Sequence, residues 1–274
     1  MRSTFATPRS ISALKTIAAR LRKDNSSLTQ TEALDKSAQL AGFANYTHAQ
    51  RNLPEVLRAL ALRCRWRDGE RKGVEVLKYP LPWSASDVTA MQLKAARVSI
   101  FEAFDEGLYS SAIASSQSMA RYWLVQAMRE LIMMEATGLR PDFIKNHLPR
   151  VRQEFSGYKY FEHAKPPGAD HLSAWRDPNT GDSLLLDEPY LPKSELHSRA
   201  GEREGWCKRY GFEEQASSWS GTYLPPRTRL FLLAKANTSI DLSDIETKLS
   251  ALPDDFGSSD EDWLGTSELI AQPL

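Results

Sequence analysis

The longest uninterrupted helical pattern in the chain runs from Ser110 to Thr137, and it restricts the fold more than any other segment. No Pro or Gly occurs in it, and apolar side chains recur at intervals of three or four residues, which is typical of a helix that buries one face. Gly138 and Pro141 follow it, and both residue types end helices. The sequence therefore predicts one long central helix.

Strand patterns lie on both sides of this helix. Residues 60–67 alternate apolar and arginine side chains, and the turn sequence DGERKG leads to a second strand, so a hairpin is expected over residues 60–79. A second hairpin is expected over residues 171–190. The other predicted elements are a helix at 87–97, a strand at 97–104, a helix at about 193–210, strands at 212–217 and 228–236, and a flexible crossing loop at 142–169. This order indicates an α+β fold with mainly antiparallel sheets.

Three short helices are predicted before the first strand. Ser10 or Ser12 can cap the first helix, Thr29 and Glu32 have the spacing of a capping box for the second, and Gly42 ends it. The third helix must end before the proline at position 54. The expected organisation is a helical module (1–54), an α+β body (55–237), and a short helix with an acidic tail (238–274).

The helical module resembles a known motif through Leu28, Thr29, Ala33, Leu34, Ala38, Gly42, Phe43 and Tyr46. These residues are similar to a short helical motif found beside glyoxalase-superfamily domains in bacterial proteins. The rest of the chain resembles an uncharacterised proteobacterial family met near integrative elements and plasmids. The resemblance implies no activity, and the body lacks the spaced His and Glu ligands that a glyoxalase metal site requires.

Cysteine usage and hydropathy indicate a cytoplasmic protein. The two cysteines, Cys64 and Cys207, have no CxxC partner, so free thiols in a reducing compartment are expected. No apolar run is long enough to span a membrane. The basic N-terminus lacks the apolar core of a secretory signal, and it fits either an amphipathic transit peptide or a docked first helix.

Charge is distributed unevenly although the net charge is zero. Residues 1–80 carry fifteen Lys or Arg and seven Asp or Glu, whereas residues 238–274 carry one Lys and nine acids. A basic N-terminal half is suited to a phosphate backbone, and it is equally compatible with solvated surfaces or a protected sheet edge. The candidate nucleic-acid-binding residues are Arg20, Arg22, Lys23, Arg63, Arg65, Arg67, Arg71 and Lys72.

Acids and a histidine gather at the ends of the second predicted hairpin. Hairpin pairing would bring Asp170 and His171 close to Asp187 and Glu188, which would place a base, an acid and a charge within reach of one another. These four residues are the candidate catalytic group. The alternative is that they are ordinary turn and rim residues.

A third candidate site is an aromatic platform formed by Trp219 and Tyr223 with Arg227 and Arg229. Such a group can stack a base and hold a phosphate. The alternative is that these aromatic side chains cover an edge of the core.

Several specific motifs are absent. The chain contains no phosphate-binding glycine loop, no HExxH helix and no nucleophile elbow, and its histidines lack metal-ligand spacing. His163 with Asp170 and His171 is the only histidine cluster to consider. We therefore expect no metal and no cofactor.

Sequence-specific groove reading by the helical module is also disfavoured. His48 stands where a helix-turn-helix needs an apolar anchor for its recognition helix. The expected function is a non-enzymatic binding protein of a plasmid or mobile-element system, which contacts nucleic acid or a protein partner through its basic N-terminal half. The alternative is a hydrolase or nuclease-like enzyme centred on Asp170, His171, Asp187 and Glu188. No pattern indicates an oligomeric state.

Overall fold

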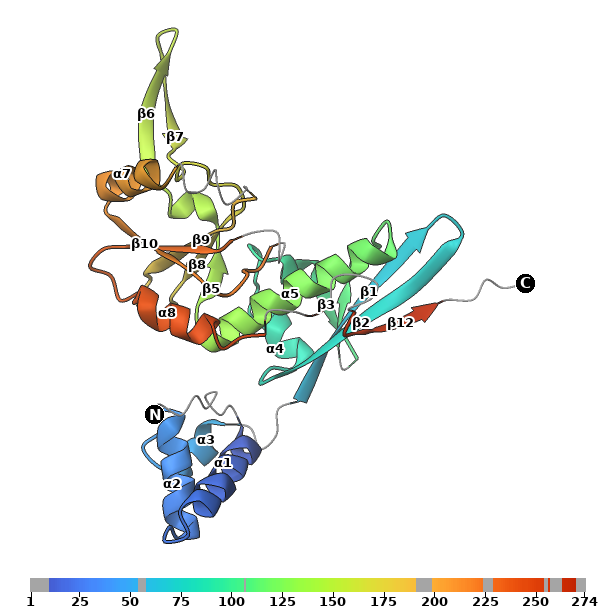
Figure 1. The fold of residues 1–274 in the computed structure, drawn as a ribbon. Coiled ribbons are helices and arrows are strands. Elements are labelled where there is room, and N and C mark those ends of the chain that lie inside the picture. The colour runs from blue at the N-terminus through green and yellow to red at the C-terminus, as the bar shows by residue number, and fades with distance from the viewer. Residues whose placement is uncertain are drawn as a thin grey trace. The chain divides into compact units, whose positions relative to one another are not determined.

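A computed structural model describes residues 10–53, 58–105, 107–190, 199–223, 229–253, 256 and 263–269. It contains two compact units: Met1–Leu60 with Tyr79–Ser84, and Ala61–Lys78 with Ala85–Leu274. Helices come first along the chain, and mainly antiparallel sheets with one long helix follow (Figure 1). The predicted α+β class is confirmed.

The N-terminal helices are α1 (Ile11–Asp24), α2 (Gln30–Leu40) and α3 (Tyr46–Asn52). Ser10 caps α1 by accepting a hydrogen bond from the Ala13 amide, and Thr29 and Glu32 form the predicted capping box of α2. Gly42 follows α2 at a φ of 82°, a left-handed conformation that glycine adopts without strain. The core of these helices consists of Ile11, Leu14, Ala38 and Ala49.

The first sheet has the strand order β12-β2-β1-β4-β3. Its strands are β1 (Arg58–Asp68), β2 (Arg71–Leu81), β3 (Phe101–Phe104), β4 (Gly107–Ser110) and β12 (Thr266–Leu269). β1 and β2 are the two strands of the predicted hairpin. β4 runs parallel to β1, with Leu62 opposite Leu108, whereas β12 and β3 pair antiparallel with β2 and β4.

The long helix α5 (Gln117–Thr137) begins seven residues later than predicted. The predicted start at Ser110 is wrong because Gly107–Ser110 forms β4 instead. Ser116 then caps the helix by accepting a hydrogen bond from the Met119 amide. The helix ends as predicted, at Gly138 with a φ of 78°. Buried apolar residues such as Leu124, Met128 and Leu131 line its interior face.

Residues 85–104 also differ from the prediction. The helix expected at 87–97 is the shorter α4 (Ala85–Ala90), because Gln92 has a φ of 51° that no helix can include. A 3-10 turn, η1 (Arg97–Ile100), replaces the start of the strand expected at 97–104. The Glu130 carboxylate accepts the Arg97 and Val98 amides and so holds this turn against α5.

The second sheet has the strand order β10-β11-β9-β8-β5. Its strands are β5 (Arg140–Asp142), β8 (Leu172–Arg176), β9 (Ser183–Asp187), β10 (Phe212–Ala216) and β11 (Phe231–Lys235). Helices α7 (Ala200–Tyr210) and α8 (Leu242–Leu249) belong to the same region. The predicted hairpin of β8 and β9 is confirmed, and Leu185 and Leu233 pack with Trp206 and Phe212 in its core.

The crossing loop expected at 142–169 is wrong. After a short 3-10 turn, η2 (Ile144–Asn146), the chain forms a separate hairpin of β6 (Arg150–Phe155) and β7 (Tyr158–His163). The turn between them places Ser156 and Gly157 at φ values of 49° and 82°, as in the two-residue turns that suit hairpin twist. In Figure 1 this hairpin extends away from the second sheet as a two-stranded ribbon.

Two further expectations concern the cysteines and the tail. Cys64 and Cys207 are both buried and free, as predicted. Most of the acidic stretch at 254–263, together with residues 191–198 before α7, lies outside the described residues. No helix in the described part of the chain has the length and apolar character needed to cross a bilayer.

Candidate functional site

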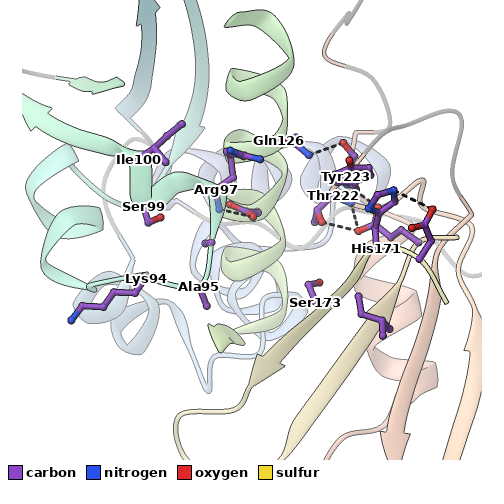
Figure 2. Close-up of a pocket in the computed structure, with 15 residues that line it drawn as sticks. Lys94, Ala95, Arg97, Ser99, Ile100, Gln126, His171, Ser173, Thr222 and Tyr223 are labelled. Carbon is purple, nitrogen blue, oxygen red and sulfur yellow. Dashed lines mark hydrogen bonds and ion pairs between the residues drawn. The ribbon is translucent and has the colours of Figure 1, made fainter. Parts of the chain in front are cut away.

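A cavity of about 520 Å³ lies on α5 between two groups of residues. One wall comes from residues 94–100, and the opposite wall comes from residues 170–173 with Thr222 and Tyr223 (Figure 2). Gln126 and Glu130 of α5 lie between the two walls. The volume is within the range of small-molecule sites, and the lining is mostly polar.

Asp170 and His171, two of the predicted catalytic residues, line this cavity. The His171 Nε2 atom lies 3.4 Å from the Asp170 carboxylate. The His171 ring also stacks on Tyr223, with a centroid separation of 3.5 Å and an interplanar angle of 24°. These two contacts fix the imidazole at the cavity wall.

Asp187 is close to this pair but does not line the cavity. Its side chain is fully buried; one oxygen accepts the Asp170 amide at 3.3 Å and the other lies 2.6 Å from Arg203 Nη1. Arg203 also binds Glu214 and the Pro167 carbonyl. Burial raises the pKa of Asp187, although Arg203 opposes this effect. Asp187 therefore serves as an internal anchor between β9 and α7.

Glu188 lines the cavity but is also buried. Its carboxylate accepts hydrogen bonds from the Thr222 amide, the Thr222 hydroxyl and the Tyr223 amide at 2.7–3.1 Å. Burial raises its pKa, and these donors oppose the shift. The role of this carboxylate is to hold residues 222–223 against β9. The four predicted catalytic residues are thus neighbours, but only Asp170 and His171 present free polar surface.

Gln126 and Glu130 of α5 are among the cavity residues that were absent from the sequence prediction. Gln126 is buried; its amide nitrogen donates to the Tyr122 hydroxyl and the Tyr223 carbonyl, and its Oε1 has no partner among the described residues. Burial raises the pKa of Glu130 to about 7, even though two backbone amides oppose the shift. Their spacing of four residues, with Tyr122 four residues earlier, places all three on one stripe of α5. The spacing of these three polar residues in the sequence is the signal that could have indicated a polar site on α5.

A second site lies on the outer face of the first sheet. Leu62, Cys64 and Trp66 of β1 are buried, so alternation places the arginines between and beyond them on the opposite face. The Trp66 indole donates to Glu75 at 3.1 Å, which assigns Glu75 to the inner face of β2 and its even-numbered neighbours to the outer face. The basic side chains of this outer face are Arg63, Arg65, Arg67, Lys72 and Lys78.

These five side chains, which we call the basic sheet face, are open to solvent or partly open. The Arg63 guanidinium lies 5.0 Å from the centre of the Tyr109 ring on β4. Two carboxylates, Glu102 and Glu268, belong to the outermost strands of the same sheet. Within the described residues no carboxylate forms an ion pair with any member of the basic sheet face.

Not all the predicted basic residues join this face. Arg71 lies on the other side of the sheet, because its guanidinium is over the Trp66 ring, 5.8 Å from the ring centre. Arg20, Arg22 and Lys23 are exposed on α1 in the N-terminal unit. Arg22 donates to Gln30 at 2.8 Å.

The predicted aromatic platform does not form. Trp219 is 1% exposed; its indole donates to the Pro253 carbonyl, and Arg129 lies over its ring at 4.5 Å. Tyr223 belongs to the cavity, whereas Arg229 lies over the ring of Phe231. Residue 227 lies outside the described residues. The physical reason is that a large indole stabilises the protein more when it is packed in the core than when it is exposed.

Metal ligation finds no support in the part of the chain that the structure describes, where no group of three or more His, Cys, Asp or Glu side chains converges. His163 ends β7 and has a buried Nδ1 without a partner. Comparisons with protein-family models, with curated proteins and with solved structures found no match.

Proposed function

We propose that this protein binds nucleic acid by placing its basic sheet face against the phosphate backbone. The observation that carries this proposal is the set of five basic side chains on one face of β1 and β2, none of which pairs with a carboxylate among the described residues. Unpaired Lys and Arg on an open surface attract a polyanion and release its counterions on binding.

The contrast with the interior arginines supports this proposal. Arg121 lies 3.0 Å from Glu75, and Arg203 bridges Asp187 and Glu214. Buried guanidinium groups in this protein thus have partners supplied by the fold, as buried charges require. Among the described residues, Arg63, Arg65 and Arg67 of β1 pair with no carboxylate, which is the arrangement expected when the counter-charge belongs to a ligand.

A place in a plasmid or mobile-element system follows from the resemblance noted for the N-terminal module. A protein partner with an acidic surface is the alternative occupant of the same face. Because phosphate contacts make affinity fall steeply with salt, the salt dependence of binding to nucleic acid distinguishes the two.

Fluorescence anisotropy with single-stranded DNA, duplex DNA and RNA probes tests the proposal. The variant Arg65→Gln/Arg67→Gln removes two exposed charges, and we expect its affinity for the best probe to fall about tenfold at moderate salt. Lys208→Gln/Arg209→Gln removes two exposed charges from α7 and is the matched control. Equal affinities for the two double variants, or binding that does not respond to salt, would contradict the proposal.

The exposed cations of α1 need a separate measurement because they belong to the other unit. The variant Arg20→Gln/Arg22→Gln/Lys23→Gln shows whether the N-terminal unit adds phosphate contacts. A loss additional to that of the sheet variant assigns a second contact to α1. An unchanged affinity confines binding to the second unit.

A nuclease-like or hydrolytic activity is the second candidate function. It is favoured by the cavity, which is lined by Asp170, His171 and Glu130 and where Glu130 has a pKa of about 7, near the working pH of a general acid or base. Incubation with plasmid DNA, RNA and chromogenic esters, with and without Mg²⁺, tests it. Hydrolytic activity that is unchanged in the variant His171→Ala would exclude this cavity as the active site.

A further inference from the structure

The hairpin of β6 and β7 makes its contacts chiefly within itself. Its strands form a separate two-stranded sheet and pair with no other strand, and nearly every residue of both strands is exposed. A two-stranded hairpin without other packing is marginally stable in water. A ribbon that pairs with no other described strand and leaves nearly all of its side chains exposed has its surface available for another molecule.

Aromatic side chains concentrate at the tip of this hairpin. Phe155 and Tyr158 form the cross-strand pair that flanks the turn, and they are 75% and 80% exposed. Tyr160 and Phe161 follow on β7 at 49% and 71%. Exposed apolar surface of this kind marks an interaction site.

The strands behind the tip carry positive charge. Arg150, Arg152 and Lys159 are exposed, and their register with β7 and β6 places them on one face of the ribbon. Among the described residues none of the three forms an ion pair. Glu154 is the one carboxylate on the same face, so this face has a net positive charge and is complementary to a phosphate backbone.

We infer that the hairpin is an arm that binds duplex DNA in its minor groove and inserts its aromatic tip between base pairs. Proteins that bind the minor groove combine cationic contacts with apolar wedges that unstack a base step and kink the duplex. Here the stem supplies the cations and Phe155 with Tyr158 supplies the wedge. Each six-residue strand spans about 20 Å, which is long enough to separate backbone contacts from a tip in the groove.

This inference rests on the proposed nucleic-acid binding and narrows its ligand to duplex DNA. The basic sheet face accounts for attraction to any polyanion, whereas the arm adds a structural distortion of a duplex. Pyrimidine–purine steps such as TA unstack most easily, and we expect the arm to prefer them.

The experiment uses the full-length protein and a duplex of about 30 base pairs with 2-aminopurine beside a central TA step and a fluorophore pair at its ends. Wild-type protein is expected to raise the 2-aminopurine fluorescence by unstacking it, and to bring the duplex ends closer. The variant Phe155→Ser/Tyr158→Ser should leave both signals at their free-duplex values while the affinity changes by about threefold or less. Both residues are exposed, so the variant should keep its thermal unfolding temperature.

Two controls separate the tip from other surfaces. Phe143→Ser/Tyr190→Ser removes two exposed aromatic side chains outside the hairpin and should unstack and bend DNA as the wild type does. Arg150→Gln/Arg152→Gln/Lys159→Gln should weaken duplex binding about ten- to hundredfold, because three phosphate contacts are removed.

The possible failures are distinguishable. If no probe binds, the proposed function fails and the inference fails with it. If the protein binds the duplex through the basic sheet face but wild type and tip variant give the same fluorescence and end-to-end distance, only the inference fails. If the wild type is a dimer in sedimentation and the tip variant a monomer, with DNA unaffected, the arm binds a second copy and the inference is overturned.

Discussion

Arg203 and Arg176 form ion pairs of the same chemistry in opposite surroundings. The Arg203 side chain is 3% exposed and holds Asp187 and Glu214, whereas Arg176 is 49% exposed and lies 3.4 Å from Asp142. Removing one partner of a buried pair leaves an uncompensated charge, which costs about 3–5 kcal/mol. An exposed pair contributes about 0–1 kcal/mol.

We therefore expect Arg203→Met to lower the free energy of unfolding by about 3–5 kcal/mol and Arg176→Met by less than about 1 kcal/mol. Urea unfolding monitored by tryptophan fluorescence measures both. Similar losses in the two variants would show that the Arg203 network does not anchor α7 to β9.

Glu130 predicts a pH dependence of stability. Its pKa is about 7 in the folded protein, compared with 4.5 for an ordinary glutamate, so the folded state binds more protons than the unfolded state between these pH values. The contribution of Glu130 to the free energy of unfolding is therefore fully present below pH 4.5 and is lost as the pH rises through 7. The variant Glu130→Gln should not show this pH-dependent loss. Its side chain also has one acceptor oxygen fewer for the Arg97 and Val98 amides of η1.

The measurement is the unfolding temperature of wild type and Glu130→Gln from pH 4.5 to 8.5. The advantage of the wild type should shrink as the pH rises, most steeply between pH 5 and 7.5. Parallel curves would show that the folded-state pKa of Glu130 is not raised.

At the scale of single residues, the sequence located the polar cluster around Asp170 but not the role of each side chain. Inside the protein, Asp187 pairs with Arg203, 16 residues away, and Glu188 accepts hydrogen bonds from Thr222, 34 residues away. A strand pattern does not specify such distant donors. Trp219 illustrates the same limit, because its neighbours Tyr223 and Arg229 suggest a surface platform whereas Arg129 and Pro253 contact its buried side chain.

The β8–β9 hairpin and the β6–β7 hairpin differ in how many contacts stabilise them. β8 and β9 lie inside the second sheet and contribute Ala174 and Leu185 to its core, whereas β6 and β7 pair with no other strand in the described part of the chain. Amide hydrogen exchange follows the free energy of the smallest opening that exposes each hydrogen bond. This difference predicts two very different exchange rates.

In exchange followed by mass spectrometry, peptides from 150–163 should exchange within about seconds to minutes, while peptides from 172–176 and 183–187 stay protected for about hours. Binding to duplex DNA should slow exchange in 150–163. Strong protection of this hairpin in the free protein would mean that it packs on a surface of its own or of another copy.

Elements with local signals were predictable, and elements that depend on distant partners were not. The caps at Ser10 and Thr29 and the glycine that ends α5 are encoded within a few residues. β4 is short and forms because β1 offers a parallel partner more than forty residues earlier in the chain. β6 and β7 were missed for another reason: the Ser156–Gly157 turn is a recognisable signal, but their exposed aromatic residues do not alternate cleanly with polar ones.

Considered as a whole molecule, the protein has no net charge, with 35 basic and 35 acidic residues. Binding to a polyanion therefore depends on where the charges lie. The basic sheet face and the hairpin stem together offer eight cations. At about 0.9 per phosphate contact, the slope of log K against log salt should be about −7 for duplex DNA.

Neutralising Arg150, Arg152 and Lys159 should reduce the magnitude of that slope to about 4.5. Titrations at four or more salt concentrations measure it. A wild-type slope near zero would exclude phosphate contacts altogether, and an unchanged slope in the stem variant would exclude the hairpin from the backbone.

The fold class was predictable from the order of helices and strands, since runs of strands around one long helix fit few architectures. The division into two sheets and the parallel pairing of β1 with β4 were not predictable. Both depend on which strands meet after long connections, and the hydrophobic pattern of a strand is the same whichever neighbour it takes.

β12 has a consequence for how the chain acquires its structure. The strand pairs with β2, and its Ser267 hydroxyl donates to Glu75, 192 residues earlier, within a buried group that also includes Arg121 and Gln117. During synthesis β2 leaves the ribosome long before β12 exists, so the nascent protein has an open sheet edge, and Glu75 lacks the Ser267 donor. Pairings of such long sequence separation form slowly, and unpaired edges recruit other strands. Completion of the first sheet is thus expected to be a late event in folding, during which the protein is most exposed to aggregation and most dependent on chaperones.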